Sequence, residues 1–319
     1  MTSYDEADLR RAAEAAIRAP SLHNSQPWRF RLRDGGIEVL GDASRQLPVA
    51  DRGGWAVRIA GGAATFNARL ALAAGGAPAR VVLRPLDGDP DVLARLTPGP
   101  PRPPTYRELD LFAAIARRHS NRQPFWPDPV PADVRAELIE AARAEGCALD
   151  LLVGMTALSG FAEIANSADR VLRRDFRYQA ELAGWVHADA APDGVPVMAG
   201  APVAEPQDLL PQRPFGERTR AGGRDFEPEP LVAVLSTAAD RTVDQLAAGQ
   251  ALQRVLLTVT GAGLAASMMS QPIEVPAARE QLRRSLGRGG APQMTLRIGY
   301  GVAGRPTARR GLGEFIEPR

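Results

Sequence analysis

The segment RRHSNRQPF, residues 117–125, holds the side chains best suited to bind an anion. Arg118, Ser120 and Arg122 could converge there on a phosphate through charge-assisted hydrogen bonds. All 39 basic residues of the chain are arginines, so there is no lysine for a P-loop, a pyridoxal Schiff base or a Ser/Lys pair. Any anion must therefore be held by arginine or by backbone amides. A plain basic helix end, favoured by the helix dipole, is the alternative interpretation.

The segment PSLHNSQPW, residues 20–28, offers polar groups on a restricted backbone. A proline near each end limits the conformations of the chain, so a rigid loop is predicted. Ser21, Asn24 and Gln26 would then present hydroxyl and amide groups in fixed positions. Such a loop suits recognition of a flat heterocycle that is rich in donors and acceptors. A simple turn before an edge strand is the alternative.

Two more segments complete the pattern: SQPIEV at residues 270–275 and PTARR at residues 306–310. Each of the four segments is a weak signal alone, whereas the four together are fairly specific. They resemble the nitroreductase family of FMN-dependent oxidoreductases. Their order over nearly the whole chain is similar to the Acg-type branch of that family, in which two fused nitroreductase-like halves form one polypeptide.

The resemblance implies a set of FMN contacts. Arg118, Ser120 and Arg309, with Arg310 beside it, match the family's ligands of the phosphate and ribityl chain, and His119 matches a position that contacts the flavin. Arg122 aligns with a basic residue near the N1/C2=O edge, where a cation favours the reduced flavin because N1 becomes anionic on reduction. The implied contacts of the ring itself are Pro20, Ser21 and Asn24, together with the backbone of Pro272, Ile273, Glu274 and Val275, a segment that offers N–H groups to the N5 and O4 side.

The two halves have lost different parts of the family pattern. Ordinary nitroreductases are homodimers with the flavin at the subunit interface, which implies that the halves here replace two subunits. The first half keeps PSLHNSQPW but begins too late for an Arg-x-Ser-x-basic segment. The second keeps RHSNR, QPIEV and PTARR but has EGCALDLLVG where the other loop would lie. We therefore expect one complete flavin site per chain, at the junction of the halves, and a non-functional symmetry-related site.

The proline-rich segment TPGPPRPPT, residues 97–105, predicts an extended connector. It separates a first nitroreductase-like half, residues 1–96, from a second half, residues 106–319. Periodicity and turn signals predict an α+β fold with long helices on mixed or antiparallel sheets. The expected helices cover about 5–18, 57–74, 107–118, 131–145, 178–186 and 243–269, and the expected strands about 28–32, 37–40, 80–83, 148–153, 231–236 and 294–300.

A faint internal repeat relates GGAATFNARLALAAGG, residues 61–76, to AGQALQRVLLTVTGAG, residues 248–263. Both have Gly-x-Ala, then apolar spacing and a terminal glycine. Two unrelated core helices are the alternative. The repeat agrees with the two-half organisation that the resemblance implies.

The segment 188–230 is rich in Pro, Gly and short polar residues, and it is longer than passive loops of compact domains usually are. Arg213, Phe215, Arg218 and Phe226 give it groups for stacking and for pairing with anions. We expect a lid over the flavin, with a poorly ordered surface loop as the alternative.

Several classes of site and location are disfavoured. Cys147 is the only cysteine, and with three histidines in the chain the usual zinc spacings are absent. The run from Gly299 to Gly304 matches G-x-G-x-x-G, but Arg305-Pro306 follows instead of a helix. The acidic start has no signal-peptide pattern, and the uncharged run 255–273 carries too many polar residues for a membrane span, so we expect a buried helix ending in a loop and a cytoplasmic protein.

We expect an FMN-dependent oxidoreductase of nitroreductase type, in which NAD(P)H delivers hydride to flavin N5 and a nitroaromatic or quinone-like acceptor is then reduced. An FMN-sequestering or storage protein with a covered flavin and little turnover is the alternative. A nucleic-acid-binding protein would rest only on the pI near 9.1, because the net charge is +2 and arginines alternate with acids. The expected partners are NAD(P)H and a small-molecule acceptor, without nucleic acid or membrane, and the expected state is a monomer (a pseudo-dimer) or a homodimer.

Overall fold

A computed structural model describes residues 4–33, 35–85, 89–189, 191–202, 208–213, 215–216, 229–287, 289–302 and 304–317. The chain divides into two compact units. The first combines Met1–Arg118 with Asp240–Gly261 and Arg309–Arg319, and the second combines His119–Ala239 with Ala262–Ala308. Each unit is therefore assembled from segments that lie far apart in the sequence.

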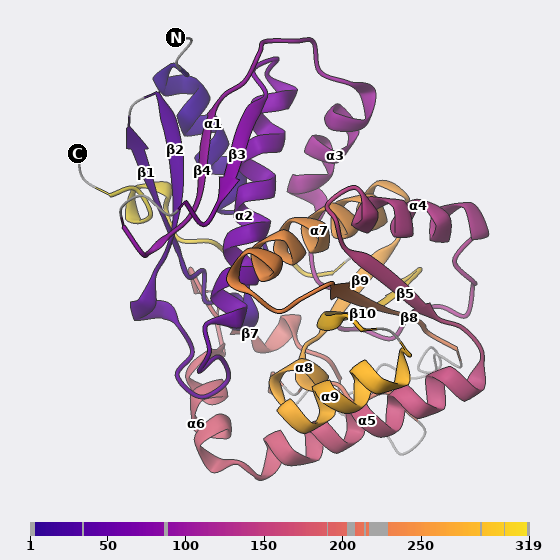
Figure 1. The fold of residues 1–319 in the computed structure, drawn as a ribbon. Coiled ribbons are helices and arrows are strands. Elements are labelled where there is room, and N and C mark those ends of the chain that lie inside the picture. Colours follow the sequence, from indigo (N-terminus) through magenta and orange to yellow (C-terminus); the bar gives the residue numbers. More distant parts are fainter. Residues whose placement is uncertain are drawn as a thin grey trace. The chain divides into compact units, whose positions relative to one another are not determined.

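The first unit is built on an antiparallel sheet, drawn in indigo to purple in Figure 1. Its strands stand in the order β1-β2-β4-β3 and are β1 Trp28–Arg33, β2 Gly36–Gly41, β3 Ala79–Leu83 and β4 Val92–Pro98. Its helices are α1 Glu6–Ala16, α2 Trp55–Ala74, α3 Tyr106–Arg117 and α7 Thr242–Gly261, with 3₁₀ turns at Leu22–Asn24, Ala43–Arg45 and Leu312–Glu314. Because α2 packs against α1, α3 and α7, it lies at the centre of the helical part of this unit.

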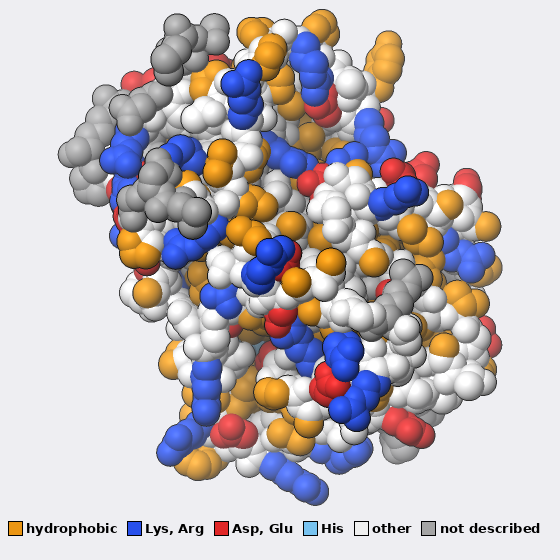
Figure 2. Space-filling view, viewed as in Figure 1, with side chains coloured by type: hydrophobic (Ala, Val, Ile, Leu, Met, Phe, Trp, Pro, Cys, Tyr) orange, Lys and Arg blue, Asp and Glu red, His pale blue; other side chains and the backbone are white. Residues whose placement is uncertain are grey.

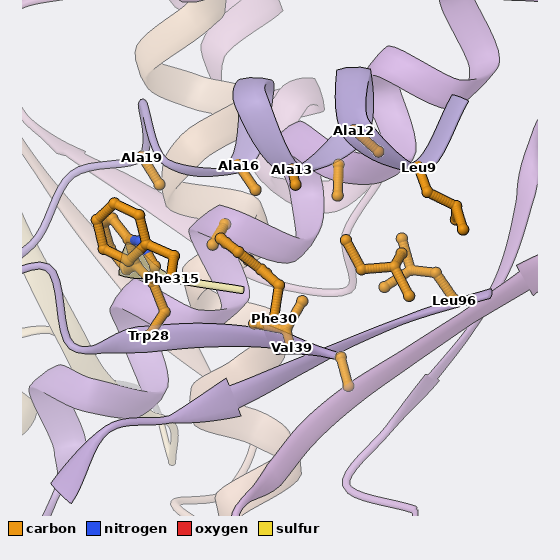
Figure 3. Packing of buried hydrophobic residues seen from close by; sticks show 14 of the residues in the cluster. Leu9, Ala12, Ala13, Ala16, Ala19, Trp28, Phe30, Val39, Leu96 and Phe315 are labelled. Carbon is orange, nitrogen blue, oxygen red and sulfur yellow. The ribbon is translucent and has the colours of Figure 1, made fainter. Parts of the chain in front are cut away.

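The core of the first unit lies between α1 and the sheet, as Figure 3 shows. One face of α1 is almost entirely alanine, which lets the helix lie close to the strands. The residues that meet there are Leu9, Ala12, Ala13, Ala16 and Ala19 on the helix side and Trp28, Phe30, Val39, Leu96 and Phe315 opposite them. Phe315 is 0% exposed, and its carbonyl accepts the Phe30 N–H at 2.7 Å. The segment around Phe315 thus completes the core.

α2 and α7 meet backbone to backbone at Gly62 and Gly249. A Cβ built on either glycine would lie 2.9 Å from the Cα of the other and would overlap a carbonyl of the facing helix. Both helices have 20 residues, and each residue of α7 is numbered 187 above its counterpart in α2. Arg58 and Gln245, which are hydrogen-bonded to each other, are counterparts by this offset. The two helices therefore pair equivalent residues, as a local two-fold axis would.

The second unit contains another antiparallel sheet, in the order β5-β8-β10-β9. Its strands are β5 Ala148–Leu152, β8 Leu231–Thr237, β9 Ala265–Met269 and β10 Ala291–Gly299, and a small parallel pair is formed by β6 Val186–His187 and β7 Val195–Pro196. Its helices are α4 Ala132–Arg143, α5 Met155–Arg174, α6 Phe176–Gly184, α8 Gln271–Glu274 and α9 Pro276–Ser285, with a 3₁₀ turn at Val197–Ala199. α5 packs against α8 and α9, and these two pack against β10 (Figure 1).

The two sheets share one topology. In each, the first, second, fourth and third strands along the chain are neighbours, and a 20-residue helix joins the second strand to the third. The offset between α2 and α7 is also the offset between the repeated segments 61–76 and 248–263. The faint repeat in the sequence therefore coincides with a repeat in topology.

Most predicted elements are present within one to three residues of the predicted bounds, but the predicted helix 243–269 is wrong in its second part. α7 ends at Gly261, and β9 begins at Ala265 and pairs with β10. Gly263 between them has φ +72°, which ends a right-handed helix. The uncharged run 255–273 is thus a helix end, a strand and part of a short helix rather than one buried helix.

Several further elements had no predicted counterpart, among them the short strands β6 and β7. β4 Val92–Pro98 lies partly in the predicted connector, so the extended segment after it begins at Gly99. α5, α8 and α9 had no predicted counterparts either. The packing units also divide the chain differently from the predicted halves, because α3 and α7 follow the connector in sequence and yet pack in the first unit. The halves, residues 1–96 and 106–319, remain an interpretation of the repeat.

Candidate functional site

The loop between α1 and β1 holds three non-glycine residues in the left-handed region. φ is 54° at His23, 56° at Asn24 and 52° at Gln26, and all three residues are buried. Each such conformation costs on the order of 1 kcal/mol and persists only where the surroundings fix it, most often at functional sites. The loop is thus a fixed structure, as its two prolines predict.

Gln26 closes this loop. Its N–H donates to Ser21 Oγ at 2.9 Å, and its Nε2 donates to the Asn24 carbonyl at 3.3 Å. Its Oε1 accepts the N–H of Arg310 at 3.1 Å. Gln26 is 0% exposed, so it acts as a buried connection between the loop and the segment 306–310.

Two arginines converge on the turn that follows α1. Arg118 Nη2 donates to the Arg18 carbonyl at 3.2 Å. Arg309 donates from Nε to the Ile17 carbonyl and from Nη2 to the Ala19 carbonyl, both at 2.9 Å. Arg118 is 6% exposed, and within the described part of the chain its Nε has no hydrogen-bond partner. Hydrogen bonds to three consecutive carbonyls thereby hold two guanidinium groups next to the loop 20–28.

Burial disfavours the charged form of both groups. It lowers the pKa of Arg118 to about 10. It lowers the pKa of Arg309 to about 9, and the nearby charges of Arg118 and Arg18 act in the same direction. Both arginines are still cations at neutral pH. A buried cation is costly until an opposite charge is placed beside it, so this part of the first unit is suited to a bound anion.

In the second unit, the segment after α3 runs beside β9. Ser120 forms an isolated parallel bridge with Ala266, and the Asn121 N–H donates to the Ala266 carbonyl at 2.9 Å. Asn121 Oδ1 accepts the N–H of Gln123 at 2.8 Å. His119 and Ser120 are half-buried. The backbone of this segment is therefore fixed by the sheet.

Three glycines of the G-x-G-x-x-G match serve packing. A Cβ on Gly304 would lie 2.6 Å from the Ser120 carbonyl oxygen, and one on Gly301 would lie 3.0 Å from Asn121 Nδ2. A Cβ on Gly299 would lie 2.9 Å from Phe125 Cβ. The glycines thus make room for the segment 120–125, and the rejection of a dinucleotide-binding fingerprint has a physical reason.

Arg122 is directed at the segment 188–230. Its Nη1 donates to the Ala199 carbonyl at 3.1 Å, and its Cζ lies 4.8 Å from the centroid of the Phe215 ring. The neighbouring Gln123 donates from Nε2 to the Gly200 carbonyl at 3.0 Å. The segment 188–230 therefore packs on the predicted flavin-binding arginine of this unit.

The segment 270–275 forms a tight helical turn. The N–H groups of Ile273 and Glu274 both donate to the Ser270 carbonyl, at 2.8 and 2.9 Å, and the Val275 N–H donates to the Gln271 carbonyl at 3.3 Å. We expected these N–H groups to face a ligand. In this structure they are used inside the turn.

The Glu274 side chain, 1% exposed, anchors the segment 188–230 to α8. It forms an ion pair with Arg213, and its Oε2 accepts the Tyr178 hydroxyl at 3.0 Å. Arg213 also donates to Ser270 Oγ at 3.3 Å. Burial raises the pKa of the Tyr178 hydroxyl well above its usual value, so it donates to Glu274 as a neutral phenol.

The described parts of the segment 188–230 are packed. Val195, Ala201, Leu210 and Phe215 are buried. Of the predicted lid residues, Arg213 and Phe215 make the contacts given above, whereas Arg218 and Phe226 lie outside the described residues. These described residues pack within the second unit, and the role of the segment as a lid over a flavin remains a prediction.

The predicted site residues fall in both units. Pro20, Ser21, Asn24, Arg118, Arg309 and Arg310 belong to the first, and His119, Ser120, Arg122, Pro272, Ile273, Glu274 and Val275 belong to the second. The first unit brings together residues from both predicted halves, because Arg118 and Arg309 contact the turn 17–19 and Arg310 contacts Gln26. Sequence reasoning named Gln26 and Arg213 as candidate polar groups but did not find that Gln26 closes the loop or that Arg213 pairs with Glu274.

Charges on the surface are mixed. On the face shown in Figure 2, arginine side chains alternate with acidic and apolar ones, which is typical of a solvated surface. Among the residues described, no helix has the length and apolar character needed to cross a membrane. Nor does this part of the chain contain a group of three or more His, Cys, Asp or Glu residues placed to bind a metal ion.

The nitroreductase family model matches residues 115–300. A relative from Mycobacterium tuberculosis strain H37Rv that carries an NAD(P)H nitroreductase name is 32% identical, over 99% of this chain and 93% of its own. The acg protein of the same strain, also with an NAD(P)H nitroreductase name, is 30% identical over 91% of this chain and 88% of its own.

Two solved structures align with part of this chain. The FMN-dependent nitroreductase NfnB from Mycobacterium smegmatis, in complex with NADPH, is 18% identical with a TM-score of 0.43 and matches 66% of this chain and 98% of its own. A nitroreductase with bound FMN from Desulfitobacterium hafniense is 14% identical with a TM-score of 0.44 and has the same coverage, 66% and 98%. With the family match over more than half of the sequence and relatives that align along almost all of it, the chain belongs to the nitroreductase family of oxidoreductases.

Proposed function

We propose that this protein is an FMN-dependent oxidoreductase that takes hydride from NAD(P)H and reduces a nitroaromatic or quinone-like acceptor. The observation that carries the proposal is the buried guanidinium of Arg118, beside Arg309 and next to the strained loop 20–28. Family membership supplies the class of reaction. The names of the relatives support a nicotinamide as electron donor.

The arginine pair fits the phosphate of FMN. Arg118 Nε, which has no partner among the described residues, supplies a donor where one is needed. A guanidinium fork matches two oxygens of a phosphate, and an anion offsets the cost of burying the Arg118 cation. Pro20, Ser21 and Asn24 lie in the adjoining loop. The family resemblance adds His119, Ser120, Arg122 and residues 272–275 as further proposed contacts.

The chemistry that bound FMN supplies is acceptance of hydride at N5 and delivery of electrons to the acceptor. The residues of the chain bind and orient. Arg118 and Arg309 neutralise the phosphate, and the fixed loop 20–28 provides a wall whose strain is already present before binding. Arg122 favours the reduced ring by its charge. No side chain has to act as a general acid or base.

The absorption spectrum of the purified protein tests the proposal. We expect flavin bands, either as isolated or after addition of FMN, and quenching of FMN fluorescence on titration with the protein. A protein that shows neither bands nor quenching would not be a flavoprotein, and the proposal would be rejected.

A second candidate function is sequestration of FMN with little turnover. It is favoured by the buried contacts Arg213–Glu274 and Arg122–Phe215, which fix the segment 188–230 on the second unit. Anaerobic mixing of the FMN-loaded protein with NADH and with NADPH separates the two functions. Rapid bleaching of the flavin supports the oxidoreductase, and bleaching slower than that of free FMN supports sequestration.

The finer expectations also belong to this proposal. We propose one flavin per chain, a cytoplasmic location, and a monomer with a built-in pseudo-dimer or a homodimer. Light scattering of the FMN-loaded protein distinguishes the two states of assembly.

A further inference from the structure

A segment from late in the chain lies along the edge of the first sheet. β1 is an edge strand of that sheet. The Phe30 N–H donates to the Phe315 carbonyl at 2.7 Å, and the Glu317 N–H donates to the Phe30 carbonyl at 2.9 Å. Ile316 forms a parallel bridge with Phe30. We call residues 311–317 the strap, and Figure 1 shows them in yellow beside β1.

Glu317 adds two ion pairs at this edge. Its Oε2 pairs with Arg31 Nε at 2.7 Å, and its Oε1 pairs with Arg29 Nη1 at 3.0 Å. The two arginines alternate along β1, so both side chains leave the same face of the sheet. The Glu317 side chain is 17% exposed, and water screens such a group less than it screens a surface carboxylate. Charge and backbone hydrogen bonds therefore hold the strap at the same place.

Phe315 anchors the strap in the core. The side chain is 0% exposed, and its ring centroid lies 6.4 Å from that of Trp28 and 6.3 Å from that of Phe30 (Figure 3). The Arg310 guanidinium stands over the same ring, with its Cζ 4.2 Å from the centroid. A cation in this position is attracted by the ring. The buried anchor of the strap is thus in direct contact with a residue of the proposed flavin site.

A closed turn joins Arg310 to Phe315. Gly311 and the 3₁₀ turn Leu312–Glu314 lie between them. Glu314 Oε1 accepts the Gly311 N–H at 2.9 Å, and the first carbonyl of the turn accepts the Phe315 N–H at 3.0 Å. A short turn closed by its own hydrogen bonds transmits a displacement of one end to the other. The position of Arg310 therefore depends on that of Phe315.

Arg309 and Arg310 are also held from the side of the loop 20–28. The Arg310 N–H donates to Gln26 Oε1 at 3.1 Å, and its Nη2 donates to the Gln26 carbonyl at 3.4 Å. Arg309 donates to two carbonyls of the turn 17–19. An arginine side chain that moves freely loses many rotamers when a ligand fixes it, and this opposes binding. Arginines that are fixed beforehand avoid this cost.

We propose that Phe315 and Glu317 are positioning residues of the flavin site. The strap fixes Arg309 and Arg310 before FMN binds, and it acts on the flavin through these two arginines. The inference rests on the proposed function, in which Arg309, with Arg310 beside it, binds the phosphate. The strap should therefore increase the affinity for the phosphate and leave the affinity for the isoalloxazine ring unchanged. Riboflavin, which has the ring without the phosphate, distinguishes the two.

Phe315→Leu tests the contact with Arg310. Leucine keeps an apolar side chain in the core but removes the ring under the guanidinium. We expect about fivefold weaker FMN binding and unchanged riboflavin binding in fluorescence titrations of the full chain. Phe66→Leu is the matched control, because Phe66 is 2% exposed and its ring centroid lies 4.7 Å from the Cζ of another arginine, Arg69. It should leave both affinities unchanged.

Glu317→Gln tests the edge of the strap, and the fold should survive because the ion pairs are partly exposed. We expect about threefold weaker FMN binding and unchanged riboflavin binding. Glu14→Gln is its control, since that side chain is 55% exposed on α1. In either strap variant, unchanged FMN binding would overturn the proposal. An equal loss of FMN and riboflavin binding would also overturn it, because the strap would then only stabilise the fold.

The proposed function and this inference fail separately. A parent protein that binds no flavin rejects the function, whereas hydrogen exchange of the flavin-free full chain still tests the strap. The Arg310 N–H, which is bonded to Gln26, should exchange about tenfold faster in Phe315→Leu and at the parent rate in Phe66→Leu. An unchanged rate in Phe315→Leu would show that the strap does not hold Arg310 and would overturn the inference.

Discussion

Gly62 and Gly249 lie in backbone contact, and neither position has room for a side chain. They are equivalent positions of the repeat, 187 residues apart like Arg58 and Gln245. Close approach of two 20-residue helices at glycines in matching positions is the contact that a local two-fold axis between α2 and α7 would give. The first unit therefore depends on a helix from late in the sequence.

Gly249→Ala should lower the free energy of unfolding by about 1–3 kcal/mol, because the added Cβ forces α2 and α7 apart. Gly261→Ala is the matched control on the same helix, since a Cβ there meets nothing within 4 Å. It should be neutral or slightly stabilising. Urea denaturation of both variants measures the difference, and equal stabilities would mean that the glycine contact is not needed.

Arg118→Ala should weaken FMN binding by about ten- to hundredfold, or 1.5–3 kcal/mol, through loss of charge-assisted contacts to the phosphate. The fold should survive, because the variant also removes a buried cation. Arg117→Ala, the exposed neighbour, is the control and should bind FMN normally. Fluorescence titration gives both affinities, and an unchanged value for Arg118→Ala would show that the phosphate site lies elsewhere.

Flavin content should saturate at one FMN per chain. The first half of the chain keeps the loop 20–28, and the second half keeps the arginine segments. The chain therefore has one complete set of flavin-binding segments. The ratio of released flavin absorbance to protein concentration measures the content. Two flavins per chain would contradict the argument from complementary losses.

Phe215→Ala should speed reduction of the flavin by NAD(P)H and loosen FMN, because it removes a buried ring over Arg122 from the covering segment. Phe176→Ala is the control, since Phe176 is 76% exposed on α6. Stopped-flow absorbance follows the reduction. Identical rates in the two variants and the parent protein would leave the segment 188–230 as a packed surface excursion and would remove the support for sequestration.

Acid should abolish the stabilising effect of the Arg102–Glu108 pair. The Arg102 guanidinium lowers the pKa of Glu108 to about 2. A depressed pKa stabilises the fold above the ordinary carboxyl pKa of 4.5 and loses this effect as the pH falls toward 2. Arg102→Met should therefore be slightly less stable than the parent at pH 6, and the effect is small because the pair is partly exposed. Urea denaturation should show no difference near pH 2, and a difference that persists there would have another cause.

Local signals predicted much of the fold. Periodicity and punctuation by glycine and proline placed α1, α2, α3 and α4 and most strands of both sheets. They failed where the decisive interaction is distant in sequence. Residues 265–269 continue the apolar, uncharged pattern of α7, and only their pairing with β10 makes them a strand. β4 was not predicted, because its last two residues lie in a proline-rich segment.

The candidate site could also be predicted only where the signal is local in the sequence. The loop 20–28 and Arg118 stand out as local motifs. The turn 17–19 cannot be recognised in the sequence. Its carbonyls accept hydrogen bonds from Arg118 and Arg309, and any residue could supply such a carbonyl. The positive φ angles of His23, Asn24 and Gln26 could not be predicted from the sequence either, since these residue types need not adopt them.

The interleaving of the first unit has a consequence for how the protein is made. On the ribosome, the sheet β1–β4 and α1 emerge early, but Gly249 and Phe315 follow only after most of the second unit has been synthesised. At about 5–20 residues per second, this part of the nascent chain waits on the order of ten to forty seconds before Phe315 can close its core. During that time the apolar faces of α2 and of Trp28 and Phe30 are open to other chains. Holding chaperones, rather than fast local folding, should therefore decide the yield of soluble protein.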